Sequence, residues 1–283
     1  MFVLKNYYSE LTSRNTGLLT AEEQEKIKDT RILIAGCGVG SVVAAASARF
    51  GFANFVLADG DKVEISNLNR QEYVKNDVET NKAIALKNKL LSINPGVKVK
   101  VMPRFVKINN VKSLLKGVDI VVDTIDPEDG QAILALHQEA RKNKKYIISP
   151  YDMGFGSLVI VYRPDGKTYK ELLGYPKNKS AATIIQEDFY SRFLNHTMKY
   201  IPAYLYPVVD KLLKGEIKHF PQPIIAAQML SSIVVNLIKK ISLGQKITGN
   251  PYIISLDPEL AQAEKVNKQH EKKLADPRRR RSG

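Results

Sequence analysis

The sequence predicts an α/β fold, in which a sheet begins as parallel strands, continues as antiparallel strands and carries helices on both faces. Two observations lead to this prediction. Apolar runs of strand length alternate with helix-length segments in the first half of the chain, and a glycine-rich turn directly follows the first of these runs. Strands that alternate with helices are typical of βαβ units and of a parallel sheet.

The first expected element is a short helix over about 20–27. Thr20 followed by Glu23 forms a capping box, in which the two side chains satisfy free backbone N–H groups at the start of a helix. The pattern therefore predicts that this helix begins directly after Thr20.

A glycine-rich turn follows the apolar run at residues 32–35, which predicts the first strand. Residues 36–41 read Gly-Cys-Gly-Val-Gly-Ser, so Gly36, Gly38 and Ser41 take the three positions of the G-x-G-x-x-G/A pattern. The glycines allow a tight turn and let the backbone approach a phosphate with no Cβ in the way. This spacing is typical of nucleotide-binding turns.

A helix is expected from Gly40 to about residue 50, and its N-terminus would direct free N–H groups and the positive end of its dipole at the phosphate. A second strand over 55–58 follows and ends at Asp59. A carboxylate in this position can accept hydrogen bonds from ribose hydroxyls. Together these elements predict a Rossmann-like nucleotide-binding sheet.

Residues 59–71 carry a longer and more specific pattern. They read Asp-Gly-Asp-Lys-Val-Glu-Ile-Ser-Asn-Leu-Asn-Arg-Gln, which resembles the D-x-D-x-V-x-x-S-N-L-x-R-Q signature of the ThiF/MoeB/HesA family, the bacterial relatives of ubiquitin-activating enzymes. Members of this family bind ATP, not a nicotinamide cofactor, and adenylate a carboxylate. The resemblance implies nucleotide-binding roles for Asp59, Asp61 and Gln71 beside the turn residues Gly36, Gly38, Gly40 and Ser41, and phosphate-binding catalytic roles for Asn67 and Arg70.

The resemblance extends to the residues before the first strand. Arg14 and Asn15, followed by Glu23 and Gln24, are similar to the family's R-N-x-G-x-x-x-x-x-E-Q segment. In relatives the arginine reaches into the ATP site of the neighbouring subunit, so the resemblance implies a homodimer in which Arg14 serves the partner's site. A guanidinium suits this task because it keeps its charge and can bind two phosphate oxygens at once.

A helix is expected from Lys82 to about residue 91, because apolar residues recur at helical spacing and Asn94-Pro95 then stops the pattern. Relatives carry a lysine at the start of this helix that contacts the ATP phosphates. The resemblance therefore implies a catalytic, phosphate-binding role for Lys82.

Asp126 follows an apolar run that predicts a buried strand over 118–123. Open α/β sheets bind ligands at the carboxyl ends of their strands. Relatives read D-x-x-D-N here, and the second aspartate binds the Mg²⁺ of MgATP, so the resemblance implies that Asp126 is a catalytic residue and the metal ligand. Carboxylate oxygens are ligands that Mg²⁺ prefers. Pro127 stands where relatives often have asparagine.

Further elements complete the predicted sheet. Strands are expected at 97–101, 146–149, 157–162 and 252–256, and helices at 111–115, 131–143 and 223–241. In the family the antiparallel half of the sheet carries the C-terminal tail of the substrate. Residues 151–156 could therefore line a peptide groove, although their glycines could equally form a plain turn.

The domain assignment treats residues 1–264 as one ThiF-type adenylation domain. Within it, residues 165–222 correspond to the family's variable insertion and crossover region, where helices are expected at about 183–198 and 205–214. Residues 265–283 are basic and include four consecutive arginines, which predicts a disordered tail.

The composition narrows the classes of partner. A formal net charge of +14 over 283 residues favours anionic partners such as ATP, acidic peptides or RNA, without choosing among them. No apolar run approaches the ~20 residues that span a membrane, and no secretory signal is apparent, so a cytoplasmic protein without a membrane partner is expected. Four histidines, at positions 137, 196, 219 and 270, form no metal-binding spacing and are expected on the surface or on helix faces.

The preferred interpretation is an ATP-dependent adenylyltransferase with Mg²⁺ as a second cofactor. A substrate carboxylate, at the C-terminus of a peptide or small protein, would attack the ATP α-phosphate to give an acyl-adenylate and pyrophosphate. This step requires alignment and neutralisation of phosphate charge rather than a protein nucleophile. Cys37, the only cysteine, lies inside the phosphate turn, so no thioester on this chain is expected.

Three alternatives remain at this point. The first is a tRNA-modifying dehydratase similar to the family members that cyclise threonylcarbamoyladenosine, which the net charge favours. The second is a non-catalytic partner subunit, which the presence of Arg70, Lys82 and Asp126 argues against. The third is an NAD oxidoreductase, for which a catalytic histidine or Tyr–Lys pattern is missing.

Overall fold

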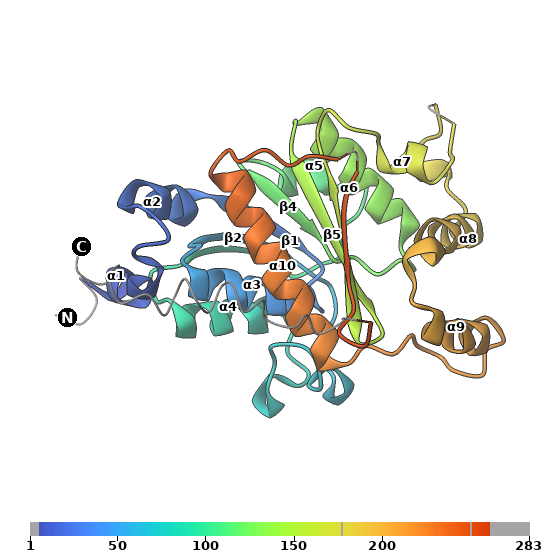
Figure 1. The fold of residues 1–283 in the computed structure, drawn as a ribbon, viewed down its shortest axis with the longest axis horizontal. Helices are drawn as coiled ribbons and strands as arrows, with labels where there is room; N and C mark the ends of the chain where they lie inside the picture. Colours follow the sequence, from blue (N-terminus) through green and yellow to red (C-terminus); the bar gives the residue numbers. More distant parts are fainter. Residues whose placement is uncertain (1–5, 177, 250, 261–283) are drawn as a thin grey trace, which may run out of the picture.

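The structure, a computed structural model, describes residues 6–176, 178–249 and 251–260. Its centre is one seven-stranded sheet with the order β3-β2-β1-β4-β5-β6-β7 (Figure 1). The strands are β1 (Arg31–Ala35), β2 (Asn54–Ala58), β3 (Lys98–Met102), β4 (Ile120–Asp123), β5 (Tyr146–Met153), β6 (Gly156–Tyr162) and β7 (Tyr252–Leu256). The first five are parallel, whereas β6 and β7 are antiparallel to their neighbours. The predicted fold class is confirmed.

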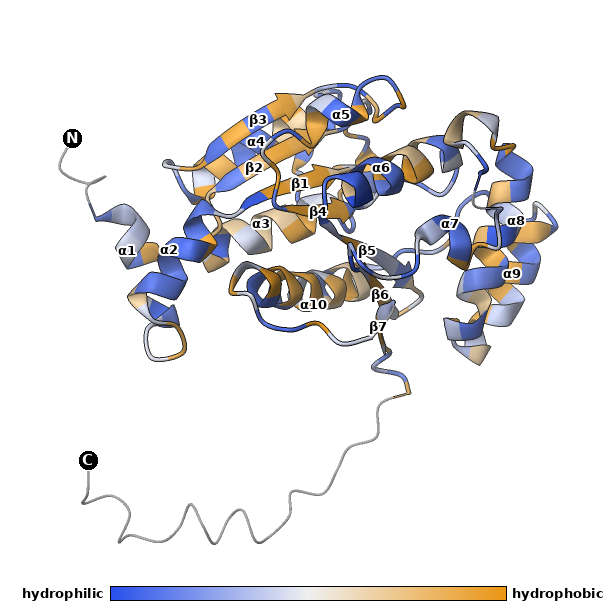
Figure 2. Cartoon of the chain, turned by 90° about the horizontal axis from the view of Figure 1, so that it is seen from above, coloured by the Kyte–Doolittle hydropathy of each residue, from blue (hydrophilic) through white to orange (hydrophobic). Residues whose placement is uncertain are grey.

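Helices cover both faces of the sheet, as Figures 1 and 2 show. One face packs against α3 (Gly40–Phe50), α4 (Lys82–Ile93) and α10 (Ile224–Ser242), and the other against α5 (Val111–Leu114) and α6 (Gly130–Lys142). The remaining helices are α1 (Tyr7–Leu11), α2 (Ala21–Asp29), α7 (Tyr169–Leu172), α8 (Gln186–Thr197) and α9 (Tyr206–Leu213).

The continuous apolar runs of the central strands follow from this layering. Leu33 on β1 belongs to the core beneath α5 and α6, while Ile32 and Ile34 belong to the core beneath α3, α4 and α10. Successive side chains of a strand point to opposite faces, and both faces are covered. Every position along the strand therefore favours an apolar side chain.

The N-terminal helix begins as expected. The Glu23 N–H donates to Thr20 Oγ1 at 3.2 Å, and the Thr20 N–H donates to Glu23 Oε2 at 2.9 Å. The capping box is therefore confirmed. It fixes the start of α2 at Ala21.

The antiparallel half differs from the sequence-based prediction. Strand β5 continues to Met153, four residues past its predicted end, and pairs with β6 up to the Met153–Gly156 pair. Only Gly154, with φ of 63°, and Phe155 form the connecting turn. Most of the proposed groove segment 151–156 is therefore strand, because pairing with β6 extends β5 beyond its apolar run.

The region 165–222 is packed onto the main sheet rather than set apart from it. Its buried residues, among them Tyr169, Phe189 and Val209, join the core beneath α6. At Gly130, the first residue of α6, a Cβ would overlap the ring of Phe189. The helices α8 and α9 were predicted, but α7 was not, because its four residues are too few for a helical pattern. The predicted tail, 265–283, lies outside the described residues.

Helix α10 corrects one expectation about apolar runs. In the described part of the chain it is the one helix that is long and apolar enough to cross a membrane, by length and composition only. In this structure it lies against β5, β6 and α3 (Figure 1). Its residues Leu230, Val234 and Ile238 are fully buried there.

Candidate active site

The glycine-rich turn is held between the ends of three strands. Gly36 has φ of 92°, a left-handed conformation that favours glycine, and its N–H donates to Ala58 O at 2.9 Å. A Cβ on Gly36 would overlap the carbonyl of Thr124, whose own hydroxyl donates to Gly36 O at 2.6 Å. The turn that follows β1 is thus fixed to β2 on one side and to the end of β4 on the other.

Gly40 and Gly38 face different surroundings. A Cβ on Gly40 would lie 2.6 Å from Thr124 Oγ1 and 2.7 Å from Ile34 Cγ2, so the start of α3 could not approach the sheet with a larger residue. At Gly38 the nearest atom is Gln71 Nε2, at 3.4 Å, which is ordinary contact with a side chain. Gly40 is therefore required by packing, whereas Gly38 borders the side of the turn on which Gln71 lies. The Gln71 side-chain oxygen is buried with no hydrogen-bond partner among the described residues.

Asp59 supports the turn from the end of β2. Its Oδ2 accepts the Cys37 N–H at 2.6 Å and its Oδ1 accepts the Asp61 N–H at 2.8 Å. Burial raises the pKa of the Asp59 carboxyl, and the two backbone N–H groups oppose that shift. Because a carboxylate oxygen can accept two hydrogen bonds, both oxygens keep an acceptor site for a ligand. The ribose-binding role of Asp59 stays a prediction.

Lys82 lies against the same acidic segment. Its Nζ is 3.2 Å from Asp61 Oδ2, and its side chain is only 11% exposed. Asn81 sets this position, since its side-chain oxygen accepts the N–H groups of Ala83 and Ile84 and its amide donates to the carbonyls of Asp59 and Asp61. The cap of α4 therefore brings Asp59, Asp61 and Lys82 together, although 20 residues separate Asn81 from Asp61.

Two hydroxyl groups connect the turn to the residues that directly follow the signature segment. The Tyr73 hydroxyl, in the buried interior, lies 2.6 Å from Cys37 O and 3.1 Å from Lys82 O. The Ser41 hydroxyl donates to Gly38 O at 2.6 Å and accepts the Glu72 N–H at 3.0 Å. Ser41 thus shapes the turn from within, and the turn, the signature and the start of α4 form one unit.

Asn67 and Arg70 are engaged with protein groups. The buried Asn67 accepts the Glu64 N–H on its side-chain oxygen at 3.0 Å, which closes the short turn of the signature. Arg70 donates from Nε to Gln222 Oε1 at 2.8 Å and from Nη1 to Ser66 O at 3.0 Å. Arg70 therefore ties the signature to the residues just before α10, and its phosphate-binding role stays a prediction.

Asp126 lies at the carboxyl end of β4, two residues after the Thr124 that contacts the turn. It is exposed, and its Oδ1 accepts the Glu128 N–H at 3.0 Å. Within the described ranges, no three His, Cys, Asp or Glu side chains are grouped as a metal cage. A lone exposed carboxylate fits Mg²⁺, which commonly takes one or two protein carboxylates and completes its shell with phosphates and water.

Arg14 is not brought to the turn of its own chain. The adjacent Asn15 donates to Phe50 O at 2.9 Å, which places this segment at the C-terminal end of α3. The turn lies at the other end of that helix, and eleven residues at 1.5 Å each span about 16 Å. The structure thus separates Arg14 from the other predicted site residues, which is the arrangement that a site shared between subunits requires.

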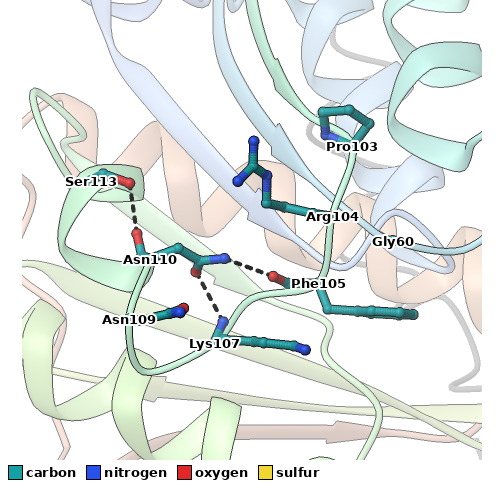
Figure 3. A pocket seen from close by; sticks show the side chains of 8 residues that line it. All are labelled: Gly60, Pro103, Arg104, Phe105, Lys107, Asn109, Asn110 and Ser113. Carbon is teal, nitrogen blue, oxygen red and sulfur yellow. Dashed lines mark hydrogen bonds between the residues drawn. The ribbon is translucent and has the colours of Figure 1, made fainter.

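A cavity of about 640 Å³ borders Gly60, the residue after Asp59, on the side of the loop that follows β3, and its residues were missed from the sequence (Figure 3). It is lined by Gly60, Pro103, Arg104, Phe105, Lys107, Asn109, Asn110 and Ser113. Asn110 shapes the loop, since it accepts the Lys107 N–H at 2.9 Å and donates to Phe105 O at 2.8 Å. The position of this loop directly after β3 is a signal that could have found the cavity from the sequence, because the loop leaves the sheet at the same edge as the phosphate turn.

The described histidines lie on helix faces or on the surface, as expected, but the two on helices, in α6 and α8, face the core. His137 and His196 are buried, whereas His219 is exposed and His270 lies outside the described residues. His137 Nε2 lies 2.9 Å from Asp123 Oδ2, and the Ser149 hydroxyl is 3.4 Å from the same oxygen. The carboxylate at the end of β4 thus gives His137 a polar partner inside the core, which no helical pattern reveals.

Asp152 is a buried carboxyl group without a partner. It is 7% exposed, and neither of its oxygens has a hydrogen bond among the described residues. Burial raises the pKa of Asp152 from 3.8 to about 7, and the nearby charge of Arg70 opposes this shift. The folded protein therefore keeps a proton on Asp152 at pH values where the unfolded chain has lost it.

We expect this group to make the protein less stable as the pH rises from about 4 to about 7. The unfolded chain binds fewer protons over this interval, so the free energy of unfolding falls with pH and levels off above pH 7. About three pKa units correspond to roughly 4 kcal/mol. Denaturant titrations at pH 5 and pH 8 cover about two of these pKa units and should therefore show a loss of roughly 3 kcal/mol in the wild type, and a much smaller loss in Asp152→Asn. The exposed Asp210→Asn serves as the control, and an Asp152→Asn variant that behaves like it would contradict the prediction.

The fold and the site define a class: an α/β nucleotide-binding protein with a phosphate turn, an acid after the second strand and an attached signature segment. The chain belongs to the ThiF family, whose model matches residues 12–275.

Individual relatives match over parts of their length. Ubiquitin-like modifier-activating enzyme 5 of Caenorhabditis briggsae is 29% identical over 235 residues, which are 76% of this chain and 54% of the relative. The sulfur carrier protein ThiS adenylyltransferase of Bacillus subtilis (strain 168) is 38% identical over 107 residues, 36% of this chain and 32% of the relative. The chain thus spans about half or less of these curated relatives.

Solved structures share the fold. The E. coli tRNA N6-threonylcarbamoyladenosine dehydratase, in complex with ATP, matches with a TM-score of 0.61 at 20% identity, and the match covers 86% of this chain and 97% of that one.

Proposed function

We propose that the protein is an ATP-dependent adenylyltransferase that activates a substrate carboxylate as an acyl-adenylate and releases pyrophosphate. The observation that carries the proposal is the joined arrangement of the phosphate turn, Asp59, Asp61 and Lys82, which the signature segment holds in place. Family membership supports it, as does the name of the Bacillus subtilis relative.

Each part of the site has a task in this proposal. The turn residues and the N-terminus of α3 bind phosphate, and Lys82, Arg70 and Asn67 add donors and positive charge. Asp59 binds ribose, and the cavity of about 640 Å³ beside it, with Phe105 on its wall, accepts the base. Asp126 would hold Mg²⁺, which supplies further neutralisation of phosphate charge when bound.

The acyl substrate in this proposal is the C-terminus of a peptide or small protein, in line with the sulfur carrier protein in the name of one relative. The tRNA-modifying dehydratase stays the second candidate, and the net charge of +14 favours it. A homodimer in the cytoplasm completes the proposal. The homodimer is supported by the separation of Arg14 from the phosphate turn of its own chain.

Cys37 is expected to take no part in acyl transfer. It is fully buried, its N–H is bonded to Asp59, and burial raises the pKa of its thiol, so little nucleophilic thiolate forms. Cys37→Ala should therefore still form the acyl-adenylate. Mass spectrometry of the wild type with ATP and an acyl substrate should show no thioester, and a thioester at Cys37 would contradict this mechanism.

The direct test of the proposal is a comparison of ligands. Calorimetry should show binding of MgATP and no measurable binding of NAD(H). The reason is that Lys82 and Arg70 supply positive charge for a bound triphosphate. Lys82→Ala should weaken MgATP binding, whereas Lys87→Ala on the same helix serves as a control for lost charge. Tight NAD binding without ATP binding would overturn the proposal.

A further inference from the structure

A basic surface extends from the border strand β3, through the loop that follows it, to α5. No Asp or Glu occurs between Glu79 and Asp119, and six cationic side chains fall within residues 98–116. All six are exposed. This β3–α5 basic surface comprises Lys98, Lys100, Arg104, Lys107, Lys112 and Lys116.

The lysines of β3 lie on the face of the sheet that α5 covers. Met102 packs against the same core as Val111 and Leu114 of α5. Side chains two residues apart on a strand share a face, so Lys98 and Lys100 lie on the same face as Met102, about 7 Å from one another. Because β3 is the border of the sheet (Figure 2), both lysines are open to solvent on the side of α5.

The loop after β3 connects these lysines to the cations of α5. Arg104 and Lys107 line the cavity of about 640 Å³, and Ser113 of α5 lines the same cavity (Figure 3). Lys112 precedes Ser113, and Lys116 follows the end of α5. The six cations therefore belong to one continuous part of the surface.

The positive charge of this surface is not neutralised within the described part of the chain. None of its six cations forms an ion pair there. The neighbouring strand β2 carries no charged residue, and the single acid within α6, which packs beside α5, is Glu139, 3.3 Å from Lys142. A cluster of unneutralised cations attracts an anionic partner.

Protection of the sheet border explains only two of these residues. Lysines on an edge strand oppose pairing with a foreign strand, and this accounts for Lys98 and Lys100. It does not account for the cations of the loop and of α5, which lie outside the strand. Ion pairing and edge protection together therefore leave most of the surface unexplained.

We propose that the β3–α5 basic surface binds the sugar–phosphate backbone of a nucleic acid. Lysine is depleted in protein–protein interfaces, and the centres of those interfaces are apolar, whereas interfaces with nucleic acids are polar and strongly positive. Five of the six cations here are lysines, and the exposed apolar residues of this segment, Phe105 and Ile108, lie in the loop and not among the lysines of β3 and α5. This inference does not depend on the proposed adenylyltransferase activity.

The salt dependence of binding tests the proposal on the full chain. Fluorescence anisotropy with a labelled oligouridylate gives the affinity over a range of salt concentrations, and its logarithm falls with the logarithm of salt by roughly 0.7 for each phosphate contacted on a single strand. Lys98→Gln/Lys100→Gln/Lys112→Gln should reduce this slope by about 2, which weakens binding about a hundredfold at 0.1 M salt.

A matched variant controls for net charge. Lys211→Gln/Lys218→Gln/Lys246→Gln removes the same charge from exposed lysines outside the basic surface and should leave the slope unchanged. The basic residues 265–283 are present in both variants and contribute equally. Equal losses in the two variants, or no measurable binding by the wild type, would overturn the proposal.

Protection of lysines from acetylation provides a second measurement that needs no variant. Peptide mass spectrometry of the wild type, acetylated with and without the oligouridylate, resolves each lysine separately. Bound oligonucleotide should protect Lys100, Lys112 and Lys116 several-fold and leave Lys211 and Lys218 unprotected. Uniform protection of all these lysines would contradict a defined binding surface.

Further polyanions identify the partner. Equal binding of oligouridylate and oligothymidylate would show that the surface binds the backbone of RNA and DNA alike, and a preference for one of them would identify the natural polymer. Polyglutamate of equal charge should protect the same lysines less well, because its carboxylates do not reproduce the spacing of phosphates. Equal or better protection by polyglutamate would overturn the proposal in favour of an acidic protein partner.

Discussion

Asp126→Ala should lower pyrophosphate release about a thousandfold while the protein stays folded. The expected size follows from the loss of a group that organises charge stabilisation in the transition state. The side chain is exposed, and among the described residues its one hydrogen bond is with the Glu128 N–H, so its removal should disturb little else. ATP–pyrophosphate exchange with the acyl substrate measures the loss, and circular dichroism checks the fold.

A second readout of this variant needs no acyl substrate. Calorimetric titration with ATP, in the presence and absence of Mg²⁺, should show a metal-dependent gain in affinity in the wild type that is lost in Asp126→Ala. Glu128→Ala is the matched control, because its carboxylate lies two residues away and is exposed. Near-normal exchange and an unchanged metal dependence in Asp126→Ala would show that another group holds the ion.

Arg14→Ala and Asp126→Ala should each be nearly inactive alone, and a mixture of the two should regain about a quarter of wild-type activity. The reason is the position of Arg14 at the far end of α3 from its own turn. In a two-fold dimer with shared sites, half of the randomly assorted dimers are mixed, and each mixed dimer carries one site with both defects and one with neither. The arginine would stabilise charge on the β- and γ-phosphates, as an arginine finger does.

The mixing experiment requires proof that subunits exchange, for example by mass spectrometry of differently tagged chains. Arg49→Ala, an exposed arginine near the same end of α3, is the control and should stay active on its own. A mixture that stays inactive after proven exchange would place Arg14 in its own subunit's site or in no site at all.

The core of the candidate site was predictable because its pieces are local in sequence. The turn at 36–41, Asp59 and Lys82 each lie at the end or start of a predicted element, and parallel strands bring such ends to one edge of a sheet. The order of elements therefore placed these residues together before any contact was known. The structure adds how they are held, by the Cys37 N–H and by Asn81.

The features that were missed depend on distant contacts. The pairing of His137 with Asp123 links a helix face to a strand end, and both residues fit their local patterns without it. Tyr151 and Asp152 read as a loop because β5 is extended by its pairing with β6, not by its own apolar run. Similarly, the cavity between the end of α6, the start of β5 and the segment 163–180 collects lysines from three segments, none of which stands out alone.

The strand order also determines which borders of the sheet can meet other molecules. Border strand β3 carries Lys98 and Lys100, and charged lysines on an edge strand oppose the addition of a foreign strand. The opposite border, β7, reads Tyr-Ile-Ile-Ser-Leu, without charge or proline, and no described strand pairs with its outer side. Self-association through strand addition, the first step of many aggregates, would therefore begin at β7 and not at β3.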